Sequence, residues 1–87
     1  MEHQVIESKL ISMLHEQFLV PNELLTEVNY NLPLTGEVFG FNGLLLTYVF
    51  FEVQRIFGIH LGSEAVIEYG FNSINKIICQ VEKCLHK

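Results

Sequence analysis

The fold is decided by residues 42–58, NGLLLTYVFFEVQRIFG, whose two ends both carry helix-terminating signals. Asn42 belongs to the residue types that cap helix N-termini, because its side chain can accept a hydrogen bond from a backbone N–H of the first turn. Gly58, at the other end, favours the left-handed conformation that commonly closes a helix. We therefore predict a helix from residue 43 or 44 to residue 57.

Further helices are predicted on both sides of this segment. Residues 2–18 carry apolar side chains at helical spacing with polar residues between them, the pattern of a helix with one buried stripe: Ile6, Leu10, Met13, Leu14 and Phe18. Ser63 can cap a short helix over about residues 64–69, which Gly70 ends, and Ser73 can cap a final helix. The apolar face of that last helix holds Ile74, Ile77, Ile78, Val81 and Leu85.

A long irregular connection is predicted between the first two helices. Residues 21–41 are dense in asparagine, proline and glycine, which favour turns over regular structure. Seven apolar residues could pin this connection onto the core: Leu24, Leu25, Val28, Leu32, Leu34, Val38 and Phe39. The order of elements and the small size predict an all-α fold, a small four-helix bundle that forms a single domain over residues 1–87.

Charge and composition exclude several classes of partner. The formal charge is −5, from 10 acidic against 5 basic residues, and the basic residues are scattered. Phosphate binding needs a basic stripe, so we expect no nucleic acid partner. The longest nearly apolar run, residues 44–51, is far shorter than the ~20 residues that span a bilayer. Residues 1–4 lack the basic segment of a signal peptide, so we expect no membrane partner and a cytoplasmic protein.

Several segments together resemble the acyl and peptidyl carrier protein family over about residues 5–85. The segment LPLTG at 32–36 looks like the family's loop before its second helix, and RIFGI at 55–59 looks like the end of that helix. The pair Ser73-Ile74, followed by VEKCL at 81–85, resembles the last helix. The resemblance implies a four-helix bundle of the acyl-carrier-protein type with a long loop between helices I and II.

The resemblance fails at the residue that gives carrier proteins their function. Carrier proteins begin helix II with an aspartate-serine-leucine triplet, and the serine hydroxyl accepts phosphopantetheine. This chain has Asn42-Gly43-Leu44 at that place. Glycine has no oxygen to phosphorylate, and the other serines, Ser8, Ser12, Ser63 and Ser73, lie elsewhere. We therefore expect no phosphopantetheine, with Gly43 as a degenerate attachment position between Asn42 and Leu44.

The second helix also differs from the acidic helix II that typical carriers present to their partners. On a helical wheel Val49, Val53 and Phe57 form the core stripe, while Leu45, Tyr48 and Phe51 lie at other angles. By resemblance, the latter three match the positions that carriers expose, and Arg55, which can pair with Glu52, completes the predicted partner-binding set. The alternative is that the long connection folds over these residues and buries them.

No catalytic or metal site is predicted. The histidines His3, His15, His60 and His86 include no i,i+4 pair, and Cys79 and Cys84 lack metal-ligand spacing. Those cysteines are also too far apart on one helix for a disulfide, so we expect both to be reduced. Glu64 and Glu68 lie at i,i+4, which is more typical of a solvated helix face than of an acid/base pair.

The sequence therefore predicts a non-catalytic, non-carrying adaptor that docks a partner protein through an apolar helix II. The resemblance extends to carrier-related proteins of bacterial peptide-maturation systems, which makes a peptide-modifying enzyme one expected partner. One alternative is a divergent acyl carrier of lipid or polyketide synthesis. Another is a bundle that binds a fatty chain among Val49, Phe50, Val53 and Phe71. A homodimer through helix II is a further possibility, compatible with the adaptor.

Overall fold

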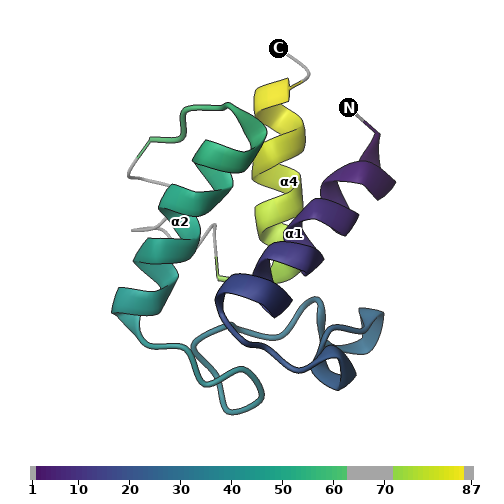
Figure 1. The fold of residues 1–87 in the computed structure, drawn as a ribbon, viewed down its shortest axis with the longest axis vertical. Coiled ribbons are helices and arrows are strands. Elements are labelled where there is room, and N and C mark those ends of the chain that lie inside the picture. Colours follow the sequence, from purple (N-terminus) through teal and green to yellow (C-terminus); the bar gives the residue numbers. More distant parts are fainter. Residues whose placement is uncertain (1, 63–71, 86–87) are drawn as a thin grey trace.

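A computed structural model of the chain describes residues 2–62 and 72–85, and within them it is all-helical, with three α-helices and no strand (Figure 1). The helices are α1 (His3–Gln17), α2 (Gly43–Phe57) and α4 (Ile74–Leu85). Helix α1 runs downward in Figure 1, α2 and α4 run upward, and the connection between α1 and α2 crosses the lower end. The predicted all-α class is confirmed. The short helix predicted at about 64–69, with its Ser63 cap, lies outside the described residues.

Helix α1 buries four of the five side chains that its sequence pattern predicts, while the fifth, Phe18, lies just past the helix end and is half-buried. The helix begins one residue after the start of the predicted range and ends one residue before its end. Its buried side chains are Ile6, Leu10, Met13 and Leu14. These positions recur every three or four residues and so lie on one face of the helix. Helix α1 packs this face against α4, as the adjacent purple and yellow ribbons in Figure 1 show.

Both predicted ends of α2 are confirmed. The Asn42 side-chain Oδ1 accepts a hydrogen bond from the Leu45 N–H at 2.8 Å, so Asn42 is the N-cap. Gly58 has φ 64° in the left-handed region, and its N–H donates to the Gln54 carbonyl. A side chain at Gly58 would be strained in this conformation, which explains why glycine ends the helix. The buried face of α2 is broader than the predicted stripe and comprises Leu46, Val49, Phe50, Val53 and Phe57.

Helix α4 completes the core as its pattern predicts. The Ser73 Oγ accepts a hydrogen bond from the Lys76 N–H at 3.1 Å, which confirms the predicted N-cap. The buried side chains are Ile74, Ile77, Ile78 and Val81, while Leu85 is partly buried against the same core. None of the helices in the described residues has the length and apolar character needed to cross a membrane.

The connection between α1 and α2 is held by a few deeply buried residues rather than by all seven predicted ones. It contains two 3₁₀ turns, Asn22–Leu24 and Glu27–Asn29. Leu34 is completely buried and Leu25 nearly so, whereas Val28 is 84% exposed and Val38 is also exposed. Val28 and Val38 are therefore corrections to the predicted set, because both side chains face solvent.

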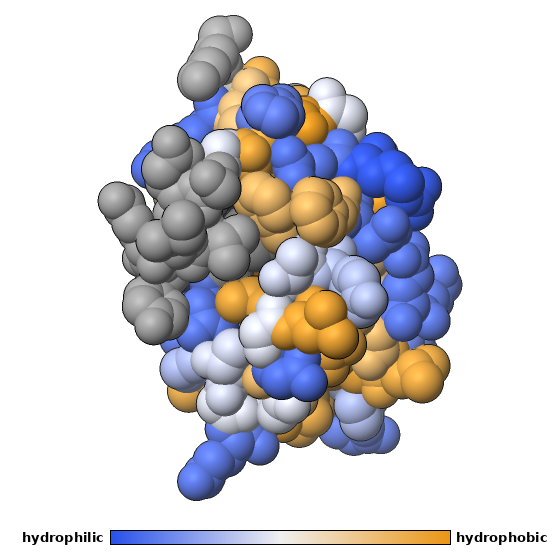
Figure 2. All heavy atoms as spheres, turned by 90° about the vertical axis from the view of Figure 1, so that its left-hand side faces the viewer, coloured by the Kyte–Doolittle hydropathy of each residue, from blue (hydrophilic) through white to orange (hydrophobic). Residues whose placement is uncertain are grey.

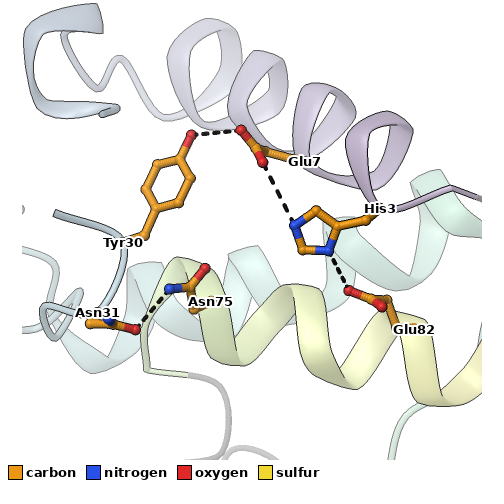
Figure 3. Close-up of polar contacts among 6 residues, drawn as sticks. All are labelled: His3, Glu7, Tyr30, Asn31, Asn75 and Glu82. Carbon is orange, nitrogen blue, oxygen red and sulfur yellow. Dashed lines mark hydrogen bonds and ion pairs between the residues drawn. The ribbon is translucent and has the colours of Figure 1, made fainter. Parts of the chain in front are cut away.

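Backbone hydrogen bonds tie the same connection to the start of α4. The Leu34 N–H donates to the Asn72 carbonyl at 3.1 Å, and the Asn75 N–H donates to the Tyr30 carbonyl at 3.1 Å. The Asn75 side chain also donates to Asn31 Oδ1 at 2.8 Å (Figure 3). Because buried backbone groups need partners, these bonds let the connection lie against the core without losing hydrogen bonds. These bonds also hold the path of the connection where it leads to Asn42, the N-cap of α2.

Candidate docking face on helix α2

The N-terminus of α2 offers no nucleophile at the position where a carrier holds its serine. Gly43 is the first residue of the helix and is exposed. A Cβ atom built on Gly43 would have no neighbouring atom within 4 Å, so space is not what requires glycine here. The nearby Thr47 hydroxyl donates to the Gly43 carbonyl at 2.9 Å, as is usual for threonine inside a helix. The backbone at Gly43 is therefore open to solvent and carries no side-chain nucleophile.

Three large apolar side chains are exposed on the outer side of α2. Leu44 is 62% exposed, Tyr48 51% and Phe51 60%. Their spacing of four and three residues puts them on one side of the helix, opposite the buried side chains. Figure 2 looks onto this side of the molecule and shows apolar side chains gathered among polar ones. We call Leu44, Tyr48 and Phe51 the outer face of α2.

The structure places the predicted residue Leu45 differently from Tyr48 and Phe51. Leu45 is half-buried and packs against the core, while its neighbour Leu44 is exposed. Each residue advances about 100° around a helix, so Leu45 lies about 100° from buried Leu46 and Leu44 lies about 160° from it. Leu45 therefore flanks the outer face. The spacing between Leu44, Tyr48 and Phe51 was the signal in the sequence that could have identified Leu44.

The outer face is uncharged along its length and ends at an ion pair. Residues 43–51 contain no charged side chain. The Arg55 guanidinium lies 2.7 Å from the Glu52 carboxylate, which confirms the predicted pair. Hydrogen bonding to Arg55 holds the pKa of Glu52 below its usual range, so the pair stays ionised at neutral pH. Arg55 continues the four-three-four spacing and lies at the end of the outer face.

Two pockets on the described residues lie along α1. One, of about 360 Å³, is lined by seven residues and is open to solvent: Ser8, Lys9, Ser12, Met13, Glu16, Gln17 and Ile56. A second, of about 230 Å³, is lined by Gln4, Glu7, Ser8, Ile11, Ser12 and Tyr30. Of the residues expected to line a fatty-chain cavity, Val49, Phe50 and Val53 are packed into the core. The fourth, Phe71, lies outside the described residues.

Polar side chains link α1 to α4 and to the connection (Figure 3). His3 Nδ1 lies 2.7 Å from Glu82 Oε1, and His3 Nε2 lies 3.8 Å from Glu7 Oε1. The Tyr30 hydroxyl donates to Glu7 Oε2 at 3.2 Å. His3 is more than half exposed, and exposed ion pairs contribute little to stability. The contacts of His3 with Glu82 and of Tyr30 with Glu7 were not predicted from sequence, because they join residues far apart in the chain. Their geometry suits a structural link between elements.

Stability at high pH is expected to depend on Tyr30. Burial, with the nearby Glu7 carboxylate, raises the pKa of Tyr30 from 10.0 to about 12. The folded state therefore favours the neutral phenol, and this contribution is complete below pH 10 and is lost as the pH rises toward 12. We expect the free energy of unfolding, measured with urea, to fall more steeply over this interval in the wild type than in Tyr30→Phe. Equal slopes for the two proteins would contradict the assignment.

The described residues contain no cluster of three or more side chains that could hold a metal ion. Among residues 2–62 and 72–85, no three histidine, cysteine or acidic side chains cluster with suitable geometry. Cys79 is exposed and Cys84 half-buried, and neither forms a disulfide. Glu64, Glu68 and His86 lie outside the described part of the chain.

Comparison with known proteins gives no relative: no family model matches the chain, and no similar curated protein or solved structure was found. The resemblance to carrier proteins thus remains a prediction from the residues of this chain. What the structure adds is the geometry around Gly43 and the exposure of the outer face of α2.

Proposed function

We propose that the chain is a non-carrying, acyl-carrier-like adaptor that docks a partner protein through the outer face of α2. In this proposal the chain is a single four-helix bundle of the carrier type, has no catalytic centre and needs no phosphopantetheine. The observation that carries the proposal is the exposure of three large apolar side chains, Leu44, Tyr48 and Phe51, on one side of a helix. Tyr48 and Phe51 were predicted for this role, Leu45 flanks them, and Arg55 borders them.

The size of the outer face supports a role in binding. The three side chains together expose on the order of 300 Å², comparable to the largest apolar patch of many soluble monomers, which is often functional. At about 25 cal/mol per Å², covering this area supplies several kcal/mol before the costs of association. Aromatic side chains such as Tyr48 and Phe51 are also enriched where proteins meet.

The residues around Gly43 support the non-carrying part of the proposal. The position is exposed and unobstructed, so a partner could approach it, but it presents only backbone. Asn42 directs its side chain to the Leu45 N–H and so serves the helix. A protein that keeps the docking helix of a carrier without its reactive serine is suited to positioning a partner. A peptide-modifying enzyme is the partner that the resemblance favours.

Replacing Tyr48 with glutamate is expected to abolish partner binding without unfolding the chain. The side chain is half exposed, so a carboxylate there remains solvated in the free protein but would be buried without a partner charge in a complex. The measurement is a pull-down from native extract, with bound proteins identified by mass spectrometry and both baits checked by circular dichroism. We expect one partner to be captured by the wild type and lost with Tyr48→Glu.

The matched control is Val28→Glu, which adds the same charge at an apolar side chain that is 84% exposed on the connection. This variant is expected to capture the same partner as the wild type. A partner retained by Tyr48→Glu, or lost equally with Val28→Glu, would contradict docking through the outer face.

A further inference from the structure

Asn42 and Gly43 form the only asparagine-glycine pair in the sequence. Asparagine is among the chemically labile residues, because the backbone nitrogen of the next residue can displace the side-chain amide and close a succinimide ring. A Cβ atom on that next residue hinders the approach of the nitrogen, and glycine has none. The sequence therefore places its most reactive asparagine at the N-terminus of α2.

The structure leaves the atoms of this reaction accessible. Asn42 and Gly43 are both exposed, and the space beside the Gly43 Cα atom is empty to 4 Å. Gly43 is the first residue of α2, so its N–H is one of the N-terminal donors that have no acceptor within a helix. Attack by the Gly43 nitrogen therefore breaks no hydrogen bond of the helix.

The N-cap bond of Asn42 opposes the reaction. The Asn42 Oδ1 atom accepts from the Leu45 N–H at 2.8 Å, which directs the side-chain amide along the first turn of α2. Ring closure requires the Cγ atom of Asn42 to turn toward the Gly43 nitrogen, so the cap bond must break first. Helix ends open locally more often than helix centres do. The frayed first turn is therefore the form of α2 that reacts.

We propose that Asn42 is a self-modification site, at which water converts the asparagine to aspartate and isoaspartate through a succinimide formed with the Gly43 nitrogen, while the cap bond to Leu45 limits the rate. The Gly43 nitrogen loses its proton to hydroxide and bonds to Cγ of Asn42, and the amide nitrogen leaves as ammonia. Water then opens the ring. Breaking the new bond to Cγ gives aspartate, and breaking the original peptide bond gives isoaspartate. The net change is uptake of water and release of ammonia.

The conversion changes α2 beside its outer face. Either product adds a negative charge next to Leu44, where residues 43–51 carry none. An aspartate still caps the helix, and the positive end of the helix favours its charge. In isoaspartate the chain runs through the former side chain, which lengthens the backbone before Gly43 and displaces the cap. This inference goes beyond the adaptor function and does not rest on it.

Peptide mapping by mass spectrometry of the folded chain, aged in mildly alkaline buffer, tests the proposal. Asn22 is the internal reference, because it is also exposed but is followed by Glu23, which has a Cβ atom. We expect Asn42 to convert several-fold faster than Asn22, with aspartate and isoaspartate both found at position 42. An isoaspartate methyltransferase labels the second product and so distinguishes it from the first.

Two further samples separate the chemistry from the effect of the cap. Gly43→Ala adds a Cβ atom that meets nothing within 4 Å, so the fold is kept, and conversion at Asn42 is expected to slow by about tenfold or more. Wild type unfolded in guanidinium chloride is expected to convert at Asn42 several-fold faster than the folded chain, because the cap bond is lost.

Three results would overturn the proposal. Conversion at Asn42 no faster than at Asn22 in the folded chain would remove the modification site. Conversion of Gly43→Ala as fast as that of the wild type, with circular dichroism showing both folded, would exclude attack by the Gly43 nitrogen. Equal rates at Asn42 in the folded and unfolded wild type would show that the cap bond does not limit the reaction.

Discussion

Gly43→Ser is expected to gain one phosphopantetheine group when incubated with coenzyme A and a broad-specificity phosphopantetheinyl transferase. The physical reason is that, in the proposed carrier-like arrangement, Gly43 lacks the hydroxymethyl side chain that would supply the attachment oxygen. A Cβ atom at Gly43 meets nothing within 4 Å, and the residue is exposed at the first turn of α2. The serine hydroxyl would therefore be accessible without any rearrangement. Intact-protein mass spectrometry measures the gain.

The controls separate the hydroxyl from the added Cβ atom. Gly43→Ala adds the same carbon without an oxygen and is expected to keep its mass, as is the wild type. The double variant Asn42→Asp with Gly43→Ser restores the acidic residue of the carrier triplet and is expected to be modified at least as fast as Gly43→Ser. If neither serine variant gains mass, the carrier-like interpretation of α2 is wrong. If the wild type gains mass, the chain is a divergent carrier after all.

Leu34→Ala is expected to lower the free energy of unfolding by about 3 kcal/mol. This is the loss typical of a leucine-to-alanine change in the hydrophobic core. Leu34 lies in an irregular connection, yet its side chain is completely buried. Removing its outer carbons leaves a cavity that the surroundings can fill only if the tethered backbone moves. That backbone is held on both sides, because the Leu34 N–H donates to Asn72 and the Leu34 carbonyl accepts from the Phe41 N–H at 2.9 Å.

Urea denaturation followed by circular dichroism measures this loss, and Val28→Ala is the control. Val28 lies in the same connection but is 84% exposed, so its truncation is expected to change stability by less than about 0.5 kcal/mol. A loss below about 1 kcal/mol for Leu34→Ala would mean that the connection rests loosely on the helices. A similar loss for both variants would contradict the burial pattern.

The helix ends could be predicted from sequence because the interactions that set them are local. Asn42 caps α2 through an N–H three residues later, and Ser73 caps α4 in the same way. Gly58 stops α2 through its own backbone conformation. The buried stripes follow from spacing along a single helix. For these features a short segment of the chain contains all the information needed.

The connection could not be predicted to the same extent, because its contacts are not local. Nothing in the segment itself distinguishes buried Leu34 from exposed Val28, since both are aliphatic residues near turn formers. Which of these two side chains is buried depends on where Asn72 and Asn75 present their hydrogen-bonding groups. At the outer face of α2, the angle around the helix was sufficient to identify Leu44, and the prediction of Leu45 followed the carrier resemblance instead of that angle.

The ties between the connection and the start of α4 have a consequence for the order of folding. The side-chain bond from Asn75 to Asn31 closes a separation of 44 residues, and the bond from Asn72 to Thr35 closes 37. Contacts between residues so far apart form late, because the intervening chain must lose entropy before they stabilise anything. The connection thus reaches its final path only when the last helix docks. During synthesis, we therefore expect the segment leading into α2 to lack its bonds to α4 until residues beyond Asn75 have left the ribosome.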